Sequence, residues 1–576
     1  MDYKNSLAKE VALIIGKKES EIIELFEIPK DESMGDFAFP CFTLARDLRK
    51  SPQEIATMIA DEFVRSKLSE IAKVEAINAY VNFTIEDKNL IKKELNKILS
   101  AKKIIEKTEK KTTTLIESPS PNTNKPLHLG HLRNMLLGAS IANMQKAIGK
   151  DAKIVNLIND RGVHICKSML AYQKSGEKET PEKAKIKSDH FVGNYYVEFN
   201  KLGAKSEAKK NMLEEEAQEM LVKWEKGDTE IHKLWEKMNK WALDGFEETY
   251  KKIGFKIEKN YYESQVYQGG KEIILKGLKE KVFEQDDTGA IFVDLTSKKL
   301  DKKILLRANG TSVYITQDIN LANIRHEEYK FDELIYVVGN EQEYHFKVLF
   351  EIYKLLGWNF GEKCKHFSYG MVELPDGKMK SREGNVIDTD ELIEQVTELA
   401  KTAVKERFKE LKSKEIEKRA KTIALGAIKF FFLKNDPLKN FVFDPKESLS
   451  FEGETGPYIQ YSHARICSIL RKAKYDDSKV KSYDANLLSR EGDKKLVKLM
   501  SKFQEVVERS ARELKPNHVC NYLISLAQAF NTYYSKHKII QEDKKVQEAR
   551  LTLIAALKKI LAEGLDLIGI EAPEKM

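Results

Sequence analysis

The chain has 576 residues, 41% of them hydrophobic and 33% charged, a composition typical of a globular protein too long for a single hydrophobic core. The formal net charge of +8 permits a polyanionic partner but does not require one. No apolar run reaches the roughly 18 residues that a membrane span needs, and lysines and glutamates fill the first residues in place of a secretory apolar stretch. We therefore expect a cytoplasmic protein of about two to four domains, without membrane contact.

The first hundred residues alternate amphipathic helices with short extended segments, which predicts an α+β domain over residues 1–105. Within it, Ser51-Pro52-Gln53-Glu54 indicates a helix start, because proline fits the first turn of a helix. Residues 74–85 alternate apolar with polar side chains and are rich in β-branched and aromatic types, which predicts a strand. The lysine-rich segment 104–113 is interpreted as a linker.

The next part of the chain, from Thr114 to Ile387, has continuous apolar strands that are each followed by a helix. This order predicts an α/β domain with a Rossmann-type, doubly wound parallel sheet. We expect the domain over residues 106–395, with a charged helical insertion at about 175–240. The expected elements are strands at 114–116, 153–158, 334–338 and 368–374 and a helix at about 130–148.

Strand signals fade after about residue 388, and amphipathic helices dominate the rest of the chain. We expect an all-α bundle over residues 396–576. Helical spacing is clearest near the end, at Leu553, Ile554, Leu557, Ile560 and Leu561.

The five cysteines are odd in number and widely scattered, and no Cys-x-x-Cys pair or Cys/His cluster has zinc spacing. We therefore expect reduced thiols, no structural zinc and no other protein-bound metal. The residues are Cys41, Cys166, Cys364, Cys467 and Cys520.

A first motif, Ser120-Pro-Asn-Thr-Asn-Lys-Pro-Leu-His-Leu-Gly-His131, leaves a predicted parallel strand and enters a helix. Such a loop places unpaired backbone N–H groups and the positive end of the helix dipole beneath a phosphate. Gly130 has no side chain, so a planar base could pack against its backbone. His128 and His131 are three residues apart and could reach one phosphate together. The alternative is two incidental histidines at a helix start.

A second motif, Gly377-Lys-Met-Lys-Ser-Arg-Glu-Gly384, follows the predicted strand 368–374. Its cations, Lys378, Lys380 and Arg382, could close over a triphosphate and neutralise charge in a transition state. The alternative is an ordinary solvated basic loop.

Together the two motifs resemble the HIGH and KMSKS signatures of class I aminoacyl-tRNA synthetases, in the same order and on the same kinds of element. Further segments are similar to the arginyl-tRNA synthetase family in particular. This resemblance implies ATP-dependent ligation of L-arginine to tRNA(Arg) through an arginyl-adenylate, with Mg²⁺ bound to ATP. The segments are Glu117–Arg133, Tyr261–Val266, Thr311–Asp318, Tyr336–His345, Ser450–Arg465 and Gly569–Met576.

For arginine, the resemblance implies a pocket of acceptors in the plane of the guanidinium. Glu263 and Asp318 would pair with that cation, and Tyr314 and Gln342 would shape the pocket. The backbone end of arginine would be held by Asn122 and His128. Without the resemblance, the preferred explanations are a helix cap for Asp318 and a surface carboxylate for Glu263.

For ATP, the resemblance implies that the catalytic donors are His128, His131 and Lys378. The fourth KMSKS residue, usually lysine, is Ser381 here, and Lys125 occupies the place of a substitute lysine before the HIGH segment. The residues assigned to ATP are Lys125, His128, Gly130, His131, Lys378, Met379, Lys380, Ser381 and Arg382.

For tRNA, the spacing of Tyr458, Tyr461 and Arg465 places them on one helical face, which suits base stacking and phosphate contact. The resemblance assigns this face and Met576 to the anticodon loop, although an aromatic stripe on a helix is more often part of a core. It also places Tyr80, Asn82 and Phe83 of the N-terminal domain at the tRNA D-loop. A monomer is expected.

Three other interpretations remain open at this point. One is a class I synthetase for another amino acid, although two pocket carboxylates argue against an apolar substrate. A second is a catalytically inactive tRNA-binding paralogue, which the retained His128, His131 and Lys378 make less attractive. A third is a small-molecule nucleotidyltransferase, which would not need the long helical C-terminal part.

Overall fold

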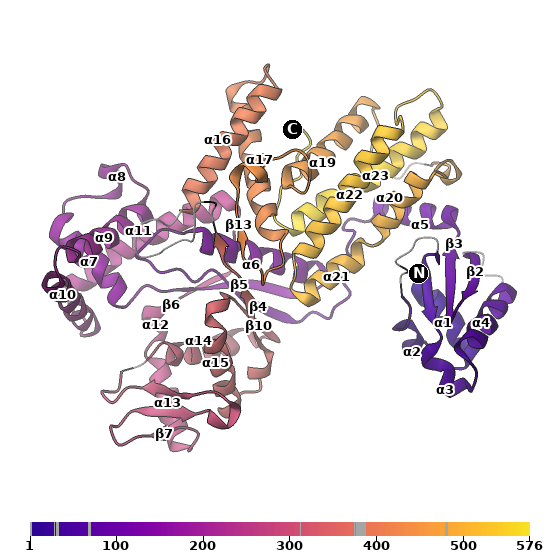
Figure 1. The fold of residues 1–576 in the computed structure, drawn as a ribbon. Helices are drawn as coiled ribbons and strands as arrows, with labels where there is room; N and C mark the ends of the chain where they lie inside the picture. Colours follow the sequence, from indigo (N-terminus) through magenta and orange to yellow (C-terminus); the bar gives the residue numbers. More distant parts are fainter. Residues whose placement is uncertain are drawn as a thin grey trace. The chain divides into compact units, whose positions relative to one another are not determined.

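The structure, a computed structural model, describes all residues except 1–2, 28, 30–33, 67–70, 312, 374, 376–387 and 478–481. The chain forms two compact units (Figure 1). The first comprises residues 1–104, 466–502 and 528–560, and the second comprises residues 105–465, 503–527 and 561–576. The three domains expected from the sequence, with boundaries near residues 105 and 395, stay a prediction.

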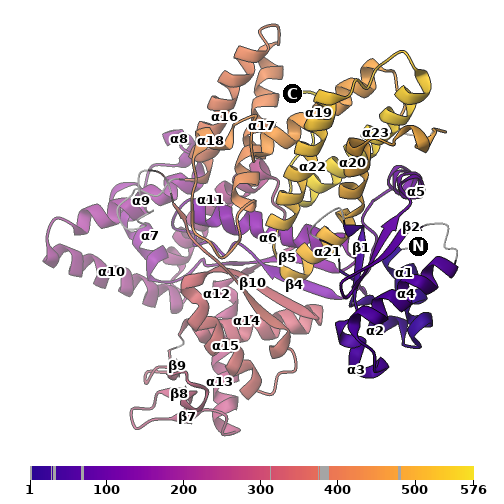
Figure 2. The same cartoon turned by 45° about the vertical axis from the view of Figure 1, so that its right-hand side comes forward.

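The first unit contains a three-stranded antiparallel sheet in the order β1-β3-β2. Its strands lie beside α1 and α4 (Figure 2). The bounds are β1 Phe37–Pro40, β2 Ile71–Ile77, β3 Tyr80–Ile85, α1 Tyr3–Ile15, α2 Glu19–Ile23, η2 Phe42–Leu44, α3 Ala45–Leu48, α4 Pro52–Ser66, α5 Asp87–Ser100, η6 Ala485–Leu487 and α20 Glu491–Ser501.

Two local predictions fall in this unit. The helix start at Ser51 is confirmed: α4 begins at Pro52, and the Ser51 and Glu54 side chains each accept a hydrogen bond from the backbone N–H of the other residue. The single strand expected over residues 74–85 is wrong. Asn78, with a left-handed φ of 54°, turns the chain there, so the segment forms the β2–β3 hairpin.

The second unit is built on a five-stranded parallel sheet in the order β11-β10-β4-β5-β6. Its strands are mostly buried, as expected when helices cover both faces of a parallel sheet. This confirms the Rossmann-type fold predicted from the sequence. The bounds are β4 Thr113–Glu117, β5 Asp151–Ile158, β6 Lys259–Tyr262, β10 Glu333–Gly339 and β11 Cys364–Tyr369.

Helices α6 (Leu129–Ala147), α14 (Tyr314–Tyr329) and α15 (Glu343–Leu355) connect or follow these strands. The α6 helix is buried along most of its length and is followed by Gly149, whose φ of 114° reverses the chain. The expected strand 368–374 is divided, because Gly370 interrupts it between β11 and β12 (Val372–Glu373), which pairs with β13 (Phe441–Val442).

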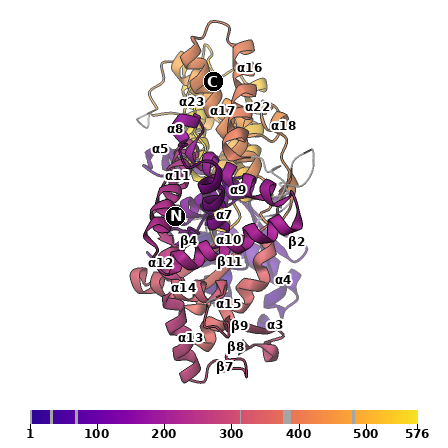
Figure 3. The same ribbon diagram turned by 90° about the vertical axis from the view of Figure 1, so that its left-hand side faces the viewer.

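The insertion is a layer of helices with its own core, visible at the front in Figure 3. Its central side chains are aromatic, including Tyr172, Phe191 and Trp241, which meet edge to face. The sequence indicated only a solvated surface here. The helices are α7 Val163–Ser175, α8 Pro181–Ala184, α9 Ser188–Gly203, α10 Glu207–Glu225 and α11 Thr229–Ile253.

A small antiparallel sheet, β7-β8-β9, lies between α13 and α14 in the chain and was not expected from the sequence. The remaining elements of the second unit are α12 Glu263–Val266, α13 Gly269–Lys279, β7 Glu284–Gln285, β8 Ile291–Asp294, η3 Thr296–Lys298, β9 Lys302–Leu306, η4 Asn340–Gln342, η5 Gly361–Lys363, α16 Thr389–Arg407, α17 Ser413–Leu433, α18 Pro445–Ser448 and α21 Phe503–Glu513.

The C-terminal part is helical, as expected, but its helices are divided between the two units. Three of them contribute residues to both: α19 (Gly456–Lys472), α22 (Asn517–Lys536) and α23 (Lys544–Leu567). Among the helices that the structure describes, none has the length and apolar character to cross a bilayer. All five cysteines lie within the described residues, buried and without a disulfide.

Candidate active site

The paired histidines cap the N-terminus of α6, where the chain leaves the end of β4. The Nδ1 atom of His128 accepts a hydrogen bond from the Gly130 N–H at 3.1 Å, and the His128 N–H donates to Nδ1 of His131, also at 3.1 Å. A side chain at residue 130 would place its Cβ only 3.0 Å from the His128 ring, which explains the glycine. Because each Nδ1 is an acceptor, each neutral ring carries its proton on Nε2.

Burial keeps both rings uncharged. It lowers the pKa of His128 to about 3, with the nearby Lys125 ammonium acting in the same direction. It lowers the pKa of His131 well below the usual value, with His128 and Lys125 contributing. Burial also lowers the pKa of Lys125. The site therefore offers neutral Nε2–H donors, one half-buried lysine and the positive end of a helix dipole.

Glu263 begins α12, directly after the edge strand β6, and only 5% of its surface is exposed. Burial raises its pKa to about 7, and the carboxylates of Asp160 and Asp318 act in the same direction. Arg161 opposes them, with its Nη1 3.6 Å from Glu263 Oε1. The alternative that Glu263 is a surface carboxylate is therefore excluded.

Asp318 lies in the second turn of α14, whose N-cap is Val313, so it does not cap that helix. Its Oδ2 is 2.8 Å from Nε2 of His345 in α15. Asp318 and Glu263 thus come from different elements, and the Asp318 carboxylate is near enough to raise the pKa of Glu263. Two neighbouring carboxylates suit a cationic substrate group.

Three residues near this carboxylate pair were not assigned a role from the sequence: Arg161, His345 and Asp160. The Asp160 carboxylate accepts hydrogen bonds from the backbone and hydroxyl of Ser264 at 2.8 and 2.7 Å, which fixes the start of α12. His345 is the last residue of Tyr336–His345, one of the segments that resemble the arginyl-tRNA synthetase family. Its position in that segment is the sequence feature that could have identified it as a site residue.

The other residues assigned to arginine lie at strand ends or helix starts. Asn122 is exposed and forms a backbone bridge with Asn159, beyond β5. Tyr314 is 74% exposed at the first residue of α14, and the exposed Gln342 ends η4, after β10. The second basic motif lies outside the described residues: Lys378, Met379, Lys380, Ser381 and Arg382.

Described residues before and after that motif contact the start of α6. On one side, the buried Arg133 guanidinium donates to the backbone carbonyls of Gly370 and Met371, and also to those of Pro437 and Lys439. On the other side, Asp388 forms an antiparallel bridge with His128. The described residues on both sides of the second motif therefore lie beside the first motif.

The helical face assigned to the anticodon carries a cation–aromatic stack on α19. The guanidinium of Arg465 lies 4.7 Å from the centroid of the Tyr461 ring, and that of Arg407 lies 5.3 Å from it. Arg407 also lies 4.7 Å from the ring of Phe451. Arg407 and Phe451 extend the set named from the sequence. Tyr458 is half-buried on the same helix.

The C-terminal tail that ends at Met576 is held against α19. Gln460 donates to the carbonyl of Glu571 at 2.9 Å, and Nδ1 of His463 lies 2.9 Å from the carbonyl of Pro573. Both side chains are buried. These contacts fix the tail beside the helix that carries Tyr461.

In the first unit, the three residues assigned to the tRNA D-loop differ in solvent exposure. Tyr80 is half-buried and packs edge to face with the exposed ring of Phe42. Asn82 is 7% exposed and Phe83 is fully buried against Phe26 and Phe63. Phe83 is therefore a core residue, and its assignment to the tRNA D-loop stays a prediction.

Comparison with known proteins identifies the class first. Residues 94–445 match the family described as tRNA synthetases class I (R), catalytic domain, so the parallel sheet with its paired histidines is that of a class I aminoacyl-tRNA synthetase. Residues 459–576 match the DALR anticodon binding domain, and residues 1–85 match the arginyl tRNA synthetase N terminal domain. The chain belongs to the arginyl-tRNA synthetase family, enzymes that ligate arginine to tRNA.

Individual relatives are similar to this chain over nearly its full length. The arginine–tRNA ligase of Treponema denticola is 46% identical over 559 residues, which are 96% of this chain and 94% of that protein. That of Bacteroides thetaiotaomicron is 42% identical over 590 residues, 99% of this chain and 98% of that protein. The Thermus thermophilus arginyl-tRNA synthetase structure aligns with a TM-score of 0.84 at 28% identity over 100% of both chains. The interpretations as another class I synthetase or a small-molecule transferase are thereby set aside.

Proposed function

We propose that the buried Glu263 carboxylate and the partly exposed Asp318 carboxylate bind the guanidinium of the substrate arginine. Ionised Asp318 and Glu263 would supply acceptors on two sides of a planar cation. A substrate without the guanidinium, such as citrulline, would leave the buried Glu263 carboxylate without its cationic ligand, which gives a strong basis for rejection. Tyr314, at the start of α14, and Gln342, after β10, would shape the pocket, and Asn122 with His128 would hold the amino and carboxylate end.

For the first chemical step, we assign the phosphates of MgATP to the start of α6. An oxygen of the arginine carboxylate attacks the α-phosphorus, the bond to the β-phosphate oxygen breaks, and pyrophosphate leaves. Negative charge on the phosphate oxygens is stabilised by the Nε2–H donors of His128 and His131, by Lys125 and by Lys378. Neutral histidines suit this role, because they donate hydrogen bonds and their protonation state does not change near pH 7.

In the second step, a terminal hydroxyl of the tRNA adenosine attacks the carbonyl carbon of the adenylate, and AMP leaves. The hydroxyl is the 2′ one by analogy with other class I enzymes. The tRNA itself is proposed to lie with its anticodon loop on Tyr458, Tyr461, Arg465 and Met576, and with its D-loop near Tyr80.

The surroundings of the reaction are also proposals. The substrates are tRNA(Arg), L-arginine and MgATP, and no structural zinc is required. None of the five cysteines, all of which the structure describes, forms a disulfide, which fits a reducing compartment, so we place the enzyme in the cytoplasm, acting as a monomer.

The test is aminoacylation of total tRNA with each labelled amino acid in turn, in the presence of ATP and Mg²⁺. Charging with arginine alone supports the carboxylate pocket, and citrulline serves as the isosteric control. Charging with another amino acid would overturn the pocket assignment. Folded protein that binds tRNA but charges nothing would favour an inactive paralogue.

A further inference from the structure

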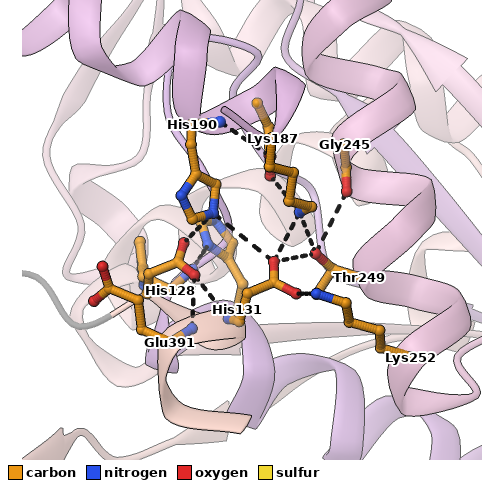
Figure 4. Close-up of polar contacts among 11 residues, drawn as sticks. His128, His131, Lys187, His190, Gly245, Thr249, Lys252 and Glu391 are labelled. Carbon is orange, nitrogen blue, oxygen red and sulfur yellow. Dashed lines mark hydrogen bonds and ion pairs between the residues drawn. The ribbon is translucent and has the colours of Figure 1, made fainter. Parts of the chain in front are cut away.

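A buried ionic cluster lies beside the paired histidines but belongs to none of the sequence motifs (Figure 4). It contains the acids Asp189, Asp388 and Asp390 and the bases Lys187, His190 and Lys252, so its formal charges balance when His190 is protonated. The bases come from the insertion, at the start of α9 and on α11, whereas Asp388 and Asp390 begin α16. All of these residues lie in the second unit.

Asp390 is the centre of the cluster. Its Oδ2 accepts hydrogen bonds from Lys187 Nζ and from the Thr249 hydroxyl, both at 2.7 Å, while Lys252 Nζ donates to Oδ1 at 2.5 Å. Asp390 and Thr249 are buried. Three partners on two elements thus hold this carboxylate in place, and removal of either lysine would leave its buried negative charge under-compensated.

Asp388 continues the network toward the active site. Its Oδ2 is 3.2 Å from Nε2 of His190. Its Oδ1 caps α16, accepting from the backbone N–H groups of Asp390 at 2.7 Å and Glu391 at 3.2 Å. The same residue forms the antiparallel backbone bridge with His128, and the Thr389 N–H donates to the Leu127 carbonyl at 2.9 Å.

The cluster is packed closely enough to act as a fixed support. A Cβ on Gly245 of α11 would lie 2.4 Å from Asp189 Oδ1, so only glycine admits the Asp189 side chain. Ligand atoms of Asp189, His190 and Asp390 lie within 4.8 Å of one another, a spacing that a metal ion could use. Two lysine ammonium groups already neutralise Asp390, however, and we interpret the cluster as an ion-pair network.

We propose that this cluster positions His128: it fixes the start of α16 on the insertion, and the Asp388–His128 bridge transmits that position to the first histidine of the ATP site. The inference rests on the phosphate-binding role proposed for His128. The cluster residues are positioning residues, since they act through the backbone of residues 127–128 rather than by contact with a substrate.

The main variant is Lys252→Met, which removes one cation from Asp390 and leaves Lys187 in place. We expect kcat for arginine-dependent ATP–pyrophosphate exchange, measured with tRNA present, to fall by on the order of 10²-fold, as for a small misplacement of a reacting group. The KM for arginine should change less than kcat, because His128 alone among the proposed arginine contacts would shift, while the carboxylate pocket on β6, α12 and α14 would stay in place. Lys252→Arg should restore most of the lost kcat.

The matched control is Lys240→Met on the same helix, which removes an exposed ion pair with Asp244 and should leave kcat unchanged. Thr249→Val is a milder second variant that removes one hydrogen bond to Asp390 without leaving a charge unpaired. We expect it to lower kcat several-fold in the same direction. Circular dichroism and thermal melting establish that each variant is folded, and an unfolded Lys252→Met protein leaves the decision to Thr249→Val.

Two results would overturn the inference: a folded variant of Lys252 or Thr249 with the kcat of the control, or a loss of kcat that Lys252→Arg does not restore. His128→Asn, assayed in parallel, separates this inference from the proposed function. If His128→Asn keeps full kcat, the assignment of His128 to ATP fails. If it lowers kcat while Lys252→Met does not, only the positioning role of the cluster fails.

Discussion

Arg325 and Glu117 form an ion pair inside the parallel-sheet unit, where the Arg325 side chain is fully buried and that of Glu117 is nearly so. Glu117 ends β4, before the histidine segment, whereas Arg325 lies on α14, the helix that carries Asp318. The guanidinium also lies over the Tyr261 ring, 5.0 Å from its centroid. The pair therefore joins the strand that leads to the residues proposed for ATP with the helix that carries part of the proposed arginine pocket.

Loss of this pair should destabilise the second unit. We expect Arg325→Met to lower the free energy of unfolding by about 3–5 kcal/mol, because it leaves the buried Glu117 carboxylate without its cationic partner. The control Arg509→Met removes an exposed pair with Glu513 and should change that free energy by less than about 1 kcal/mol. Unfolding in guanidinium chloride measures both, and equal losses in the two variants would contradict the expectation.

The buried Glu263 should make arginine binding pH-dependent. Burial raises the pKa of this carboxyl to about 7, so a growing fraction is protonated as the pH falls through neutrality. The substrate cation binds the ionised form, and the KM for arginine should therefore rise toward tenfold per pH unit below about pH 7. Initial rates from about pH 6 to about pH 8 test this. A KM for arginine that is the same across this range would remove Glu263 from the pocket, and Glu263→Gln should abolish the dependence.

Substitution of Asp318 should affect arginine and not ATP. Asp318→Ala removes a carboxylate and leaves its partner His345 and the substrate guanidinium without it. We expect kcat/KM for arginine to fall by about 10²-fold or more, equivalent to about 3 kcal/mol, with the KM for ATP nearly unchanged. Asp301→Ala, which removes an exposed carboxylate bonded to Tyr344, is the control. Normal arginine kinetics in Asp318→Ala would disprove the proposed pocket.

The Arg407 guanidinium next to Tyr461 should contribute to tRNA binding. Arg407→Leu removes one cation from the stack on Tyr461 and Phe451, and we expect a several-fold higher KM for tRNA and a shallower salt dependence of binding. Arginine activation at saturating tRNA should not change. Arg512→Leu, an exposed arginine on α21 that pairs with Glu508, is the matched control. A salt dependence equal to that of the unmodified protein would exclude a phosphate or base contact by Arg407.

The sequence predicted those features that depend on local chemistry. The cap at Ser51, the histidine-capped start of α6 and the parallel sheet follow from residue types at short spacings. The β2–β3 turn was missed because Asn78 adopts a left-handed conformation without the glycine that usually marks one. The β7-β8-β9 sheet was missed because its strands are short, and the first of them has only two residues.

Contacts between residues that are far apart in the sequence could not be predicted from it. The resemblance named Glu263 and Asp318, but Arg161 and His345 contact these carboxylates only after the strands are ordered in the sheet. Arg133 directly follows the first motif, yet its partners are four backbone carbonyls, which no residue type reveals. The burial of Phe83 was equally hidden, since a strand pattern does not determine which face meets the core.

Lys125 should matter for adenylate formation far more than for tRNA binding. It is half-buried just before the paired histidines, and Gly193 of α9 packs so closely on Pro126 that a Cβ would lie 2.6 Å from the proline Cδ. This packing fixes the backbone beside Lys125, so its ammonium can serve the phosphates in place of the lysine that Ser381 replaces. Lys125→Ala should slow ATP–pyrophosphate exchange by on the order of 10²-fold, while the Kd for tRNA from filter binding changes by less than about twofold. Lys146→Ala, at the exposed far end of α6, is the control, and an exchange rate for Lys125→Ala equal to that of this control would make Lys125 an ordinary loop lysine.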